Sequence, residues 1–209
     1  MFPSLSRRDL LAHTAAIGAA SLLPAAAGAA VTLSADHARA PRSLGSPSAE
    51  IVIKEFFSMT CGHCGRFHQQ TYPKVKSQLI DTGIIRFELH PFPLDGLALR
   101  AHALCRALPE TSYFAMVNLL LKEQKMWVGA EDPIAALRGY GRKAGVSQEE
   151  FDSIMSNRDF LQAIFDQREE ANKRFEVSST PSFIANDTHR FSGAVSYDKF
   201  VEELEKFGV

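Results

Sequence analysis

The sequence contains only three cysteines, Cys61, Cys64 and Cys105, among 209 residues. Three thiols form at most one internal disulfide, which excludes a scaffold held together by many of them. Two residues separate Cys61 from Cys64, a gap too short to join distant parts of a fold. The lone Cys-x-x-Cys pair therefore indicates redox chemistry rather than reinforcement.

An excess of charge of either sign is also missing. The 23 Lys and Arg residues nearly balance the 24 Asp and Glu residues, which gives a formal net charge of −1. Because the basic residues occur singly, the sequence argues against a nucleic-acid-binding surface. No internal repeat is visible, and a hydrophobic content of 45% with 15 Phe indicates a globular domain.

No long apolar run opens the chain, because the Ala- and Leu-rich residues 10–23 are short for a membrane span. They follow Arg7 and Arg8 and precede a series of small residues. This order predicts a cleaved secretory signal over residues 1–30, and hence an exported protein. The paired arginines favour the twin-arginine route; the Sec route and an uncleaved anchor are the alternatives. Loss of Arg7, Arg8 and Asp9 would change the net charge to −2.

The first part of the remaining chain predicts a strand, a helix and a second strand. Residues 31–48 are polar and broken by Pro and Gly, which predicts a loose lead-in. The run "EIVIKEFF" predicts a central strand buried on both faces. A helix is expected to begin at the cysteine pair and to kink at Pro73. The alternating "IIRFELH" predicts a second strand parallel to the first.

The rest of the chain predicts a helical insertion followed by a hairpin and a helix. Residues 94–174 have the pattern of five helices. "PSFIAND" and "THRFSG" predict two strands around an Asn-Asp turn, and residues 197–207 a last helix. With the insertion set aside, residues 49–93 and 175–209 predict an α/β domain with a thioredoxin-like fold.

The position of the cysteines, where a strand meets a helix, assigns them different roles. Only a thiolate attacks a disulfide, and the N–H groups and dipole at a helix N-terminus stabilise the Cys61 thiolate. Cys64 lies one turn further and is expected to be more buried. Cys61 is therefore predicted to exchange with the substrate, and Cys64 to close the internal disulfide. An imidazolium at His63 would stabilise the Cys61 thiolate further.

The cysteine pair has two other interpretations. A metal site would use Cys61 and Cys64 with His63 or His68. Structural zinc needs four ligands, usually from two knuckles, and no second Cys-x-x-Cys exists. A permanent structural disulfide is the other interpretation. We expect neither a metal nor another cofactor, because the redox-active disulfide is part of the chain.

Three stretches, "KEFFSMTCGHCGRFH", "HPFPLD" and "VSSTPSFIAN", resemble the DsbA-type periplasmic thiol-disulfide oxidoreductases over about residues 45–207. The resemblance implies that Thr180 and Pro181 form a cis peptide bond that lies against the active-site disulfide and pairs with an extended substrate peptide. It also implies that Glu55 is a buried acid that relays the proton of Cys64. An outward-turned Glu55 is the alternative.

The sequence departs from the family pattern in two respects. Gly62-His63 between the cysteines and Thr180 before the cis-proline are typical of milder oxidants, with a potential nearer about −180 than about −120 mV. Some relatives carry a second disulfide in the insertion. Here Ser153 stands where the partner of Cys105 would fall, which leaves Cys105 as a lone, buried thiol.

The function implied is that of a monomeric dithiol oxidase. It would donate the Cys61–Cys64 disulfide to unfolded or newly exported cysteine-containing proteins, and a quinone-linked membrane partner would reoxidise it. A disulfide isomerase or reductase of the same compartment is one alternative. A non-catalytic peptide- or metal-binding module is the other.

Overall fold

The computed structural model describes residues 31–209. The predicted signal over residues 1–30, with the question of its export route and cleavage, lies outside the described residues. Within the described part, no helix combines the length and apolar character needed to cross a membrane.

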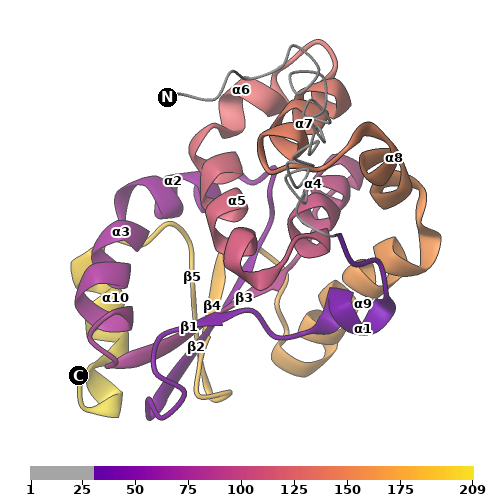
Figure 1. Cartoon of the computed structure of the whole chain (residues 1–209). Helices are drawn as coiled ribbons and strands as arrows, with labels where there is room; N and C mark the ends of the chain where they lie inside the picture. Colours follow the sequence, from indigo (N-terminus) through magenta and orange to yellow (C-terminus); the bar gives the residue numbers. More distant parts are fainter. Residues whose placement is uncertain (1–30) are drawn as a thin grey trace, which may run out of the picture.

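A five-stranded mixed sheet lies at the centre of the fold, in the order β1-β3-β2-β4-β5 (Figure 1). Its strands are β1 (Ser43–Leu44), β2 (Ile51–Phe57), β3 (Ile85–Pro91), β4 (Ser182–Ala185) and β5 (His189–Ser192). Strand β2 runs parallel to β3 and antiparallel to β4, which confirms the predicted central strand and parallel pair. The β4–β5 hairpin turns at Asn186 and Asp187, both with positive φ, as the predicted Asn-Asp turn requires.

Two groups of helices flank this sheet (Figure 1). The first consists of α2 (Gly62–Gln70), α3 (Tyr72–Val75), a π-helical segment (Lys76–Ile80), α10 (Tyr197–Leu204) and a 3-10 turn (Glu205–Phe207). The second is the insertion: α4 (Gly96–Ala107), α5 (Glu110–Lys122), α6 (Gln124–Val128), α7 (Pro133–Lys143), α8 (Gln148–Ser156) and α9 (Arg158–Phe175). The insertion has one helix more than the five predicted, because the helical run breaks at Glu123 between α5 and α6. The break between α2 and α3 lies close to Pro73, where a kink was predicted.

Successive side chains of strand β2 point in turn toward the two groups of helices. Glu55 faces α2, where its carboxylate meets the His68 ring. Lys54 faces α9, where its ammonium lies 5.3 Å from the centre of the Phe175 ring. The alternation of a strand thus places Lys54 and Glu55 on opposite faces, and Lys54 pairs with Asp187 instead.

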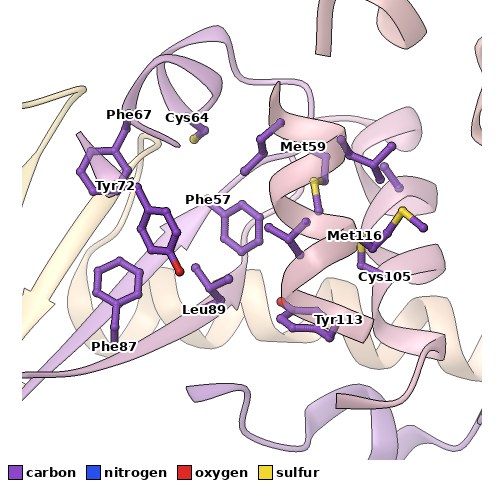
Figure 2. Packing of buried hydrophobic residues seen from close by; sticks show 14 of the residues in the cluster. Phe57, Met59, Cys64, Phe67, Tyr72, Phe87, Leu89, Cys105, Tyr113 and Met116 are labelled. Carbon is purple, nitrogen blue, oxygen red and sulfur yellow. The ribbon is translucent and has the colours of Figure 1, made fainter. Parts of the chain in front are cut away.

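A cluster of aromatic rings holds α2 on the sheet. The Phe67 ring of α2 lies 4.8 Å from the Phe183 ring of β4 and 6.0 Å from the Phe200 ring of α10. All three side chains are fully buried, and each such burial stabilises the fold by about 1.5–3 kcal/mol. Figure 2 shows Phe67 and Cys64 on the same helix among the buried side chains of the core. The packing that fixes α2 therefore also fixes Cys64.

The segment 31–48, predicted as a loose lead-in, is ordered instead. It contains α1 (Ala35–Arg39), which begins after the capping residue Ser34 and whose Arg39 pairs with Asp166 of α9 at 2.7 Å. It also contains β1, which adds an antiparallel edge strand to β3. Elements of five and two residues are too short to show a period in sequence, and contacts with α9 and β3 stabilise them.

We predict that Gly45→Ala destabilises the protein by about 1–3 kcal/mol. Gly45 follows β1 with a φ of +96°, and a Cβ at this position would lie 2.4 Å from the Ile85 carbonyl oxygen. Urea denaturation measures the change. Gly139→Ala is the matched control, because a Cβ there meets nothing within 4 Å. Since Gly139 lies inside α7, this control is expected to gain about 1 kcal/mol, and equal effects at the two positions would contradict the prediction.

Candidate active site

The two cysteines of the predicted redox pair lie at the start of α2. Cys61 is the N-cap residue of the helix, and Cys64 lies in its first turn. Cys61 is half-buried, whereas Cys64 is fully buried. The backbone N–H of Ser58 points at the Cys64 sulfur, with 3.5 Å between the nitrogen and the sulfur. Both thiols are free, so the geometry is that of the reduced pair.

The surroundings of Cys61 favour its thiolate. The largest effect is a hydrogen bond from the Cys64 thiol, which lowers the pKa of Cys61; burial opposes it. The Thr180 hydroxyl and the backbone N–H groups of His63 and Cys64 lower the pKa further. Together these groups bring the pKa of Cys61 to about 5. The helix N-terminus thus contributes as predicted, through its N–H groups.

Cys64 has the opposite tendency. Burial raises the pKa of the Cys64 thiol well above its ordinary value, and the hydrogen bond to Cys61 and the charge of Glu55 act in the same direction. At neutral pH, Cys61 therefore carries a negative charge while Cys64 keeps its proton. This difference is what a nucleophile and a resolving thiol require.

Thr180 and Pro181 lie against Cys61, immediately before β4. Their peptide bond is cis, which confirms the conformation that the family resemblance implied. The Thr180 carbonyl oxygen accepts a hydrogen bond from the Cys61 thiol at 3.3 Å. The Thr180 hydroxyl is buried and has no hydrogen-bond partner within residues 31–209. It is therefore available to the sulfur once Cys61 has lost its proton. The role of both residues in substrate binding stays a prediction.

Glu55 is fully buried on β2 rather than turned outward. Its carboxylate accepts a hydrogen bond from Nε2 of His68, with 2.9 Å between the nitrogen and Oε2. In the sequence analysis, His68 appears only as a ligand in the alternative metal interpretation. Its position four residues after Cys64, on the same face of α2, is the signal that places it beneath the cysteines.

The alternative metal interpretation names His68 as a ligand beside the two cysteines. His68 is directed at Glu55 and Asn118 through its two ring nitrogens. Across residues 31–209, no three His, Cys, Asp or Glu side chains form a group that could hold a metal ion.

The side chains of His63 and Cys105 make no contact in the described part of the structure that assigns them a role in the redox site. The His63 ring is exposed, and it makes no hydrogen bond within the described chain; the residue acts on Cys61 through its backbone N–H. A role for the imidazolium itself stays a prediction. Cys105 is fully buried on α4, and burial raises the pKa of its thiol. It is thus a small apolar residue of the core rather than a third reactive thiol.

Gln124, which the sequence did not mark, ties the insertion to the cysteine loop. Its side-chain amide donates hydrogen bonds to the carbonyl oxygens of Met59 at 2.8 Å and Cys61 at 3.0 Å. The same amide lies against Gly65, where a Cβ would sit 2.9 Å from Gln124 Oε1. Glycine is therefore needed at position 65 for this close approach. A single glutamine at the start of a short helix has no periodic pattern around it, so the sequence could not predict this contact.

Asp95 of the "HPFPLD" stretch supports the cysteine loop from the other side. One carboxylate oxygen accepts a hydrogen bond from the Thr60 hydroxyl at 2.7 Å. The other accepts from the backbone N–H of Ala98 at 2.7 Å and so caps α4. The loop before α2 is thus held by the first residues of two helices of the insertion.

Comparisons with known proteins agree with this geometry. A family model described as "Thioredoxin" matches residues 37–206. The chain is 27% identical over 164 residues to a Rickettsia conorii protein named "Putative protein-disulfide oxidoreductase". That match covers 78% of this chain and 58% of the relative. The chain therefore spans less than two thirds of the length of that relative.

Solved structures show the same fold. Wolbachia pipientis alpha-DsbA1 superposes with a TM-score of 0.72 at 24% identity, over 79% of this chain and 89% of that one. A protein-disulfide isomerase from Novosphingobium aromaticivorans superposes with a TM-score of 0.69 at 20% identity, over 80% and 96%. The thioredoxin-like fold predicted from the sequence is confirmed.

We predict that one thiolate of the reduced protein titrates with a midpoint near pH 5, because the Cys64 thiol, the Thr180 hydroxyl and two backbone N–H groups stabilise it. Ultraviolet absorbance of the thiolate measures the midpoint. Cys61→Ser removes this transition if the assignment is correct. A midpoint at the ordinary value of about 8.5 would contradict it.

Gln124→Leu is predicted to raise the pKa of Cys61 and to destabilise the protein by about 1–3 kcal/mol. The variant leaves the Met59 and Cys61 carbonyl dipoles unpaired beside the thiolate. Gln69→Leu is the matched control, because Gln69 also donates to a helical carbonyl, that of Leu121, at 3.1 Å. This control should lose stability without moving the titration, and a shift of the same size in both variants would count against the prediction.

Proposed function

The chain belongs to the thioredoxin family, and from this premise we propose that it is a DsbA-type thiol-disulfide oxidoreductase. In this proposal it donates the Cys61–Cys64 disulfide to newly exported proteins that contain cysteines. The observation that carries the proposal is the position of the pair at the start of α2, with Cys61 half-buried at the N-cap beside Thr180 and Cys64 fully buried one turn further. The opposite shifts of the two cysteine pKa values follow from this position.

The proposed reaction consists of two exchanges. A substrate thiolate attacks the Cys61 sulfur of the oxidised protein, the Cys61–Cys64 bond breaks, and Cys64 leaves as a thiolate that takes up a proton. A second substrate thiolate then attacks the substrate sulfur of the mixed disulfide. The substrate disulfide forms, and Cys61 leaves as a thiolate. Two electrons thereby pass from the substrate dithiol to the protein.

The pKa of Cys61 sets the direction of this exchange. A thiol of low pKa is a good leaving group, and a stable thiolate makes the reduced protein the favoured product. A pKa of about 5 lies between those of thioredoxin, about 7, and of the strongly oxidising DsbA, about 3.5. We therefore propose an oxidant of intermediate strength, with a potential nearer about −180 than about −120 mV.

The proposed substrate is an extended segment on either side of a cysteine. The Thr180 backbone lies beside the Cys61 sulfur, and an extended peptide that pairs with Thr180 and Pro181 would bring its own sulfur to Cys61. The remaining parts of the proposal follow the sequence: a periplasmic monomer that a quinone-linked membrane partner reoxidises.

Isomerisation or reduction of wrong disulfides is the second candidate function. Gly62-His63 and Thr180 favour it, and the Novosphingobium neighbour is named an isomerase. A protein that forms dimers in light scattering and restores scrambled ribonuclease would support this candidate over the oxidase.

We predict that the redox equilibrium with glutathione gives a potential near about −180 mV. The physical reason is the stabilised Cys61 thiolate, which favours the reduced state. A value as low as that of thioredoxin, about −270 mV, would contradict a dithiol oxidase. Cys61→Ser separates both redox functions from the third interpretation, a binding module, because only a binding module would keep its activity.

The stability of the reduced protein is predicted to depend on pH through Cys61. Its folded-state pKa of about 5 lies below the ordinary value of about 8.5, so the stabilisation is fully present above pH 8.5. It is lost as the pH falls through about 5. Urea denaturation of the reduced protein should show this loss, with the oxidised protein, which has no Cys61 thiol, as the control. Parallel pH profiles for the two forms would contradict the prediction.

A further inference from the structure

The helix that carries the cysteines also carries His68, and this histidine forms a buried pair with Glu55. The two side chains are 1% and 0% exposed. Nε2 of His68 lies 2.9 and 3.2 Å from the two Glu55 carboxylate oxygens. Buried charges are costly unless they are paired and hydrogen-bonded. A buried polar pair in the core behind the redox cysteines therefore points to a functional role.

The second ring nitrogen of His68, Nδ1, points away from Glu55. Nδ1 lies 3.2 Å from the side-chain oxygen of Asn118 on α5. Both nitrogens thus face oxygen acceptors, an arrangement in which a protonated ring donates twice. The ring is also stacked on Tyr72, with 4.7 Å between the ring centres. His68 is held in one orientation, with a carboxylate at one edge and Asn118 at the other.

Asn118 and His68 line a groove of about 600 Å³ between α5 and the α2–α3 segment. Its other lining residues are Gln69, Tyr72, Pro73, Lys76 and Lys122. Lys76 is paired with Asp81 at 2.6 Å, and burial raises the pKa of Tyr72, which stays neutral. His68 both lines this groove and is hydrogen-bonded to Glu55.

The first exchange of the proposed function creates a need for a proton at this place. Cys64 leaves as a thiolate when the substrate sulfur bonds to Cys61, and it takes up one proton because burial raises its pKa. Cys64 is fully buried, and the substrate covers the entrance at Cys61 and Thr180. Cys64 and His68 lie one turn apart on α2, and Glu55 is hydrogen-bonded to His68. The charge of Glu55 accordingly raises the pKa of Cys64.

The family resemblance already implies that Glu55 relays the proton of Cys64. We propose that His68 extends this relay to the groove, so that the proton passes between the groove and Cys64 while the substrate lies at Cys61. His68 takes the proton at Nδ1 from the groove, Glu55 receives it from Nε2 and passes it to the Cys64 thiolate, and no electrons move along this route. Reoxidation reverses the direction of the proton. The inference rests on the proposed function.

The experiment is a single turnover of the oxidised protein with excess dithiothreitol between pH 5 and 9, with and without added imidazole. His68→Ala is expected to slow mixed-disulfide formation at least tenfold, and to change its pH profile. Added imidazole, which replaces the ring that this substitution removes, should restore the rate in this variant and leave the unmodified protein unaffected. His68→Gln keeps a donor for Glu55 without a proton to transfer, so it should fold well and still be slow.

His102→Ala is the matched control. His102 is also buried, and its ring centre lies 4.8 Å from that of Phe57. Its Nε2 has no hydrogen-bond partner among residues 31–209. This control should lose stability but keep the rate and show no response to imidazole.

Two results would overturn the inference: His68 variants with the pH profile of the unmodified protein, or a slow His68→Ala variant that imidazole does not accelerate. If the unmodified protein itself does not react with dithiothreitol, the proposed function fails as well.

Discussion

The hydrogen bond from the Cys64 thiol to the Cys61 sulfur is the interaction on which the rest of the site depends. It is the largest contribution to the low pKa of Cys61, and it raises that of Cys64 at the same time. One bond therefore separates the two thiols into an anion and an acid. It forms because α2 begins between the two cysteines, which places the Cys61 sulfur at the N-terminus of the helix and the Cys64 sulfur in the core.

The two parts of the fold meet at this helix start. The sheet supplies Glu55 from one side and the cis peptide at Pro181 from the other. The insertion supplies Gln124 and Asp95, which hold the carbonyl and hydroxyl groups of the loop before α2. The insertion is therefore part of the support of the site as well as an addition to the sheet.

Local rules predicted the parts of this arrangement that lie close together in sequence. The apolar run before Cys61, the start of a helix at the pair and the difference in burial between the two sulfurs all follow from short patterns. The cis bond at Pro181 came from family resemblance. Gln124 and the pairing of Glu55 with His68 were missed, because these contacts span 63 and 13 positions and involve single side chains. The order in residues 31–48 was missed for the same reason, since it comes from α9 and β3 rather than from the segment itself.

The short strand β1 has a consequence for a protein that would handle unfolded chains. Without it, β3 would be an outer strand with a row of unpaired backbone groups, open to any extended polypeptide. Strand β1 covers part of that row with two residues, and it is itself too short to recruit another strand. In the proposed function, a client pairs instead with the backbone of Thr180, beside the Cys61 sulfur.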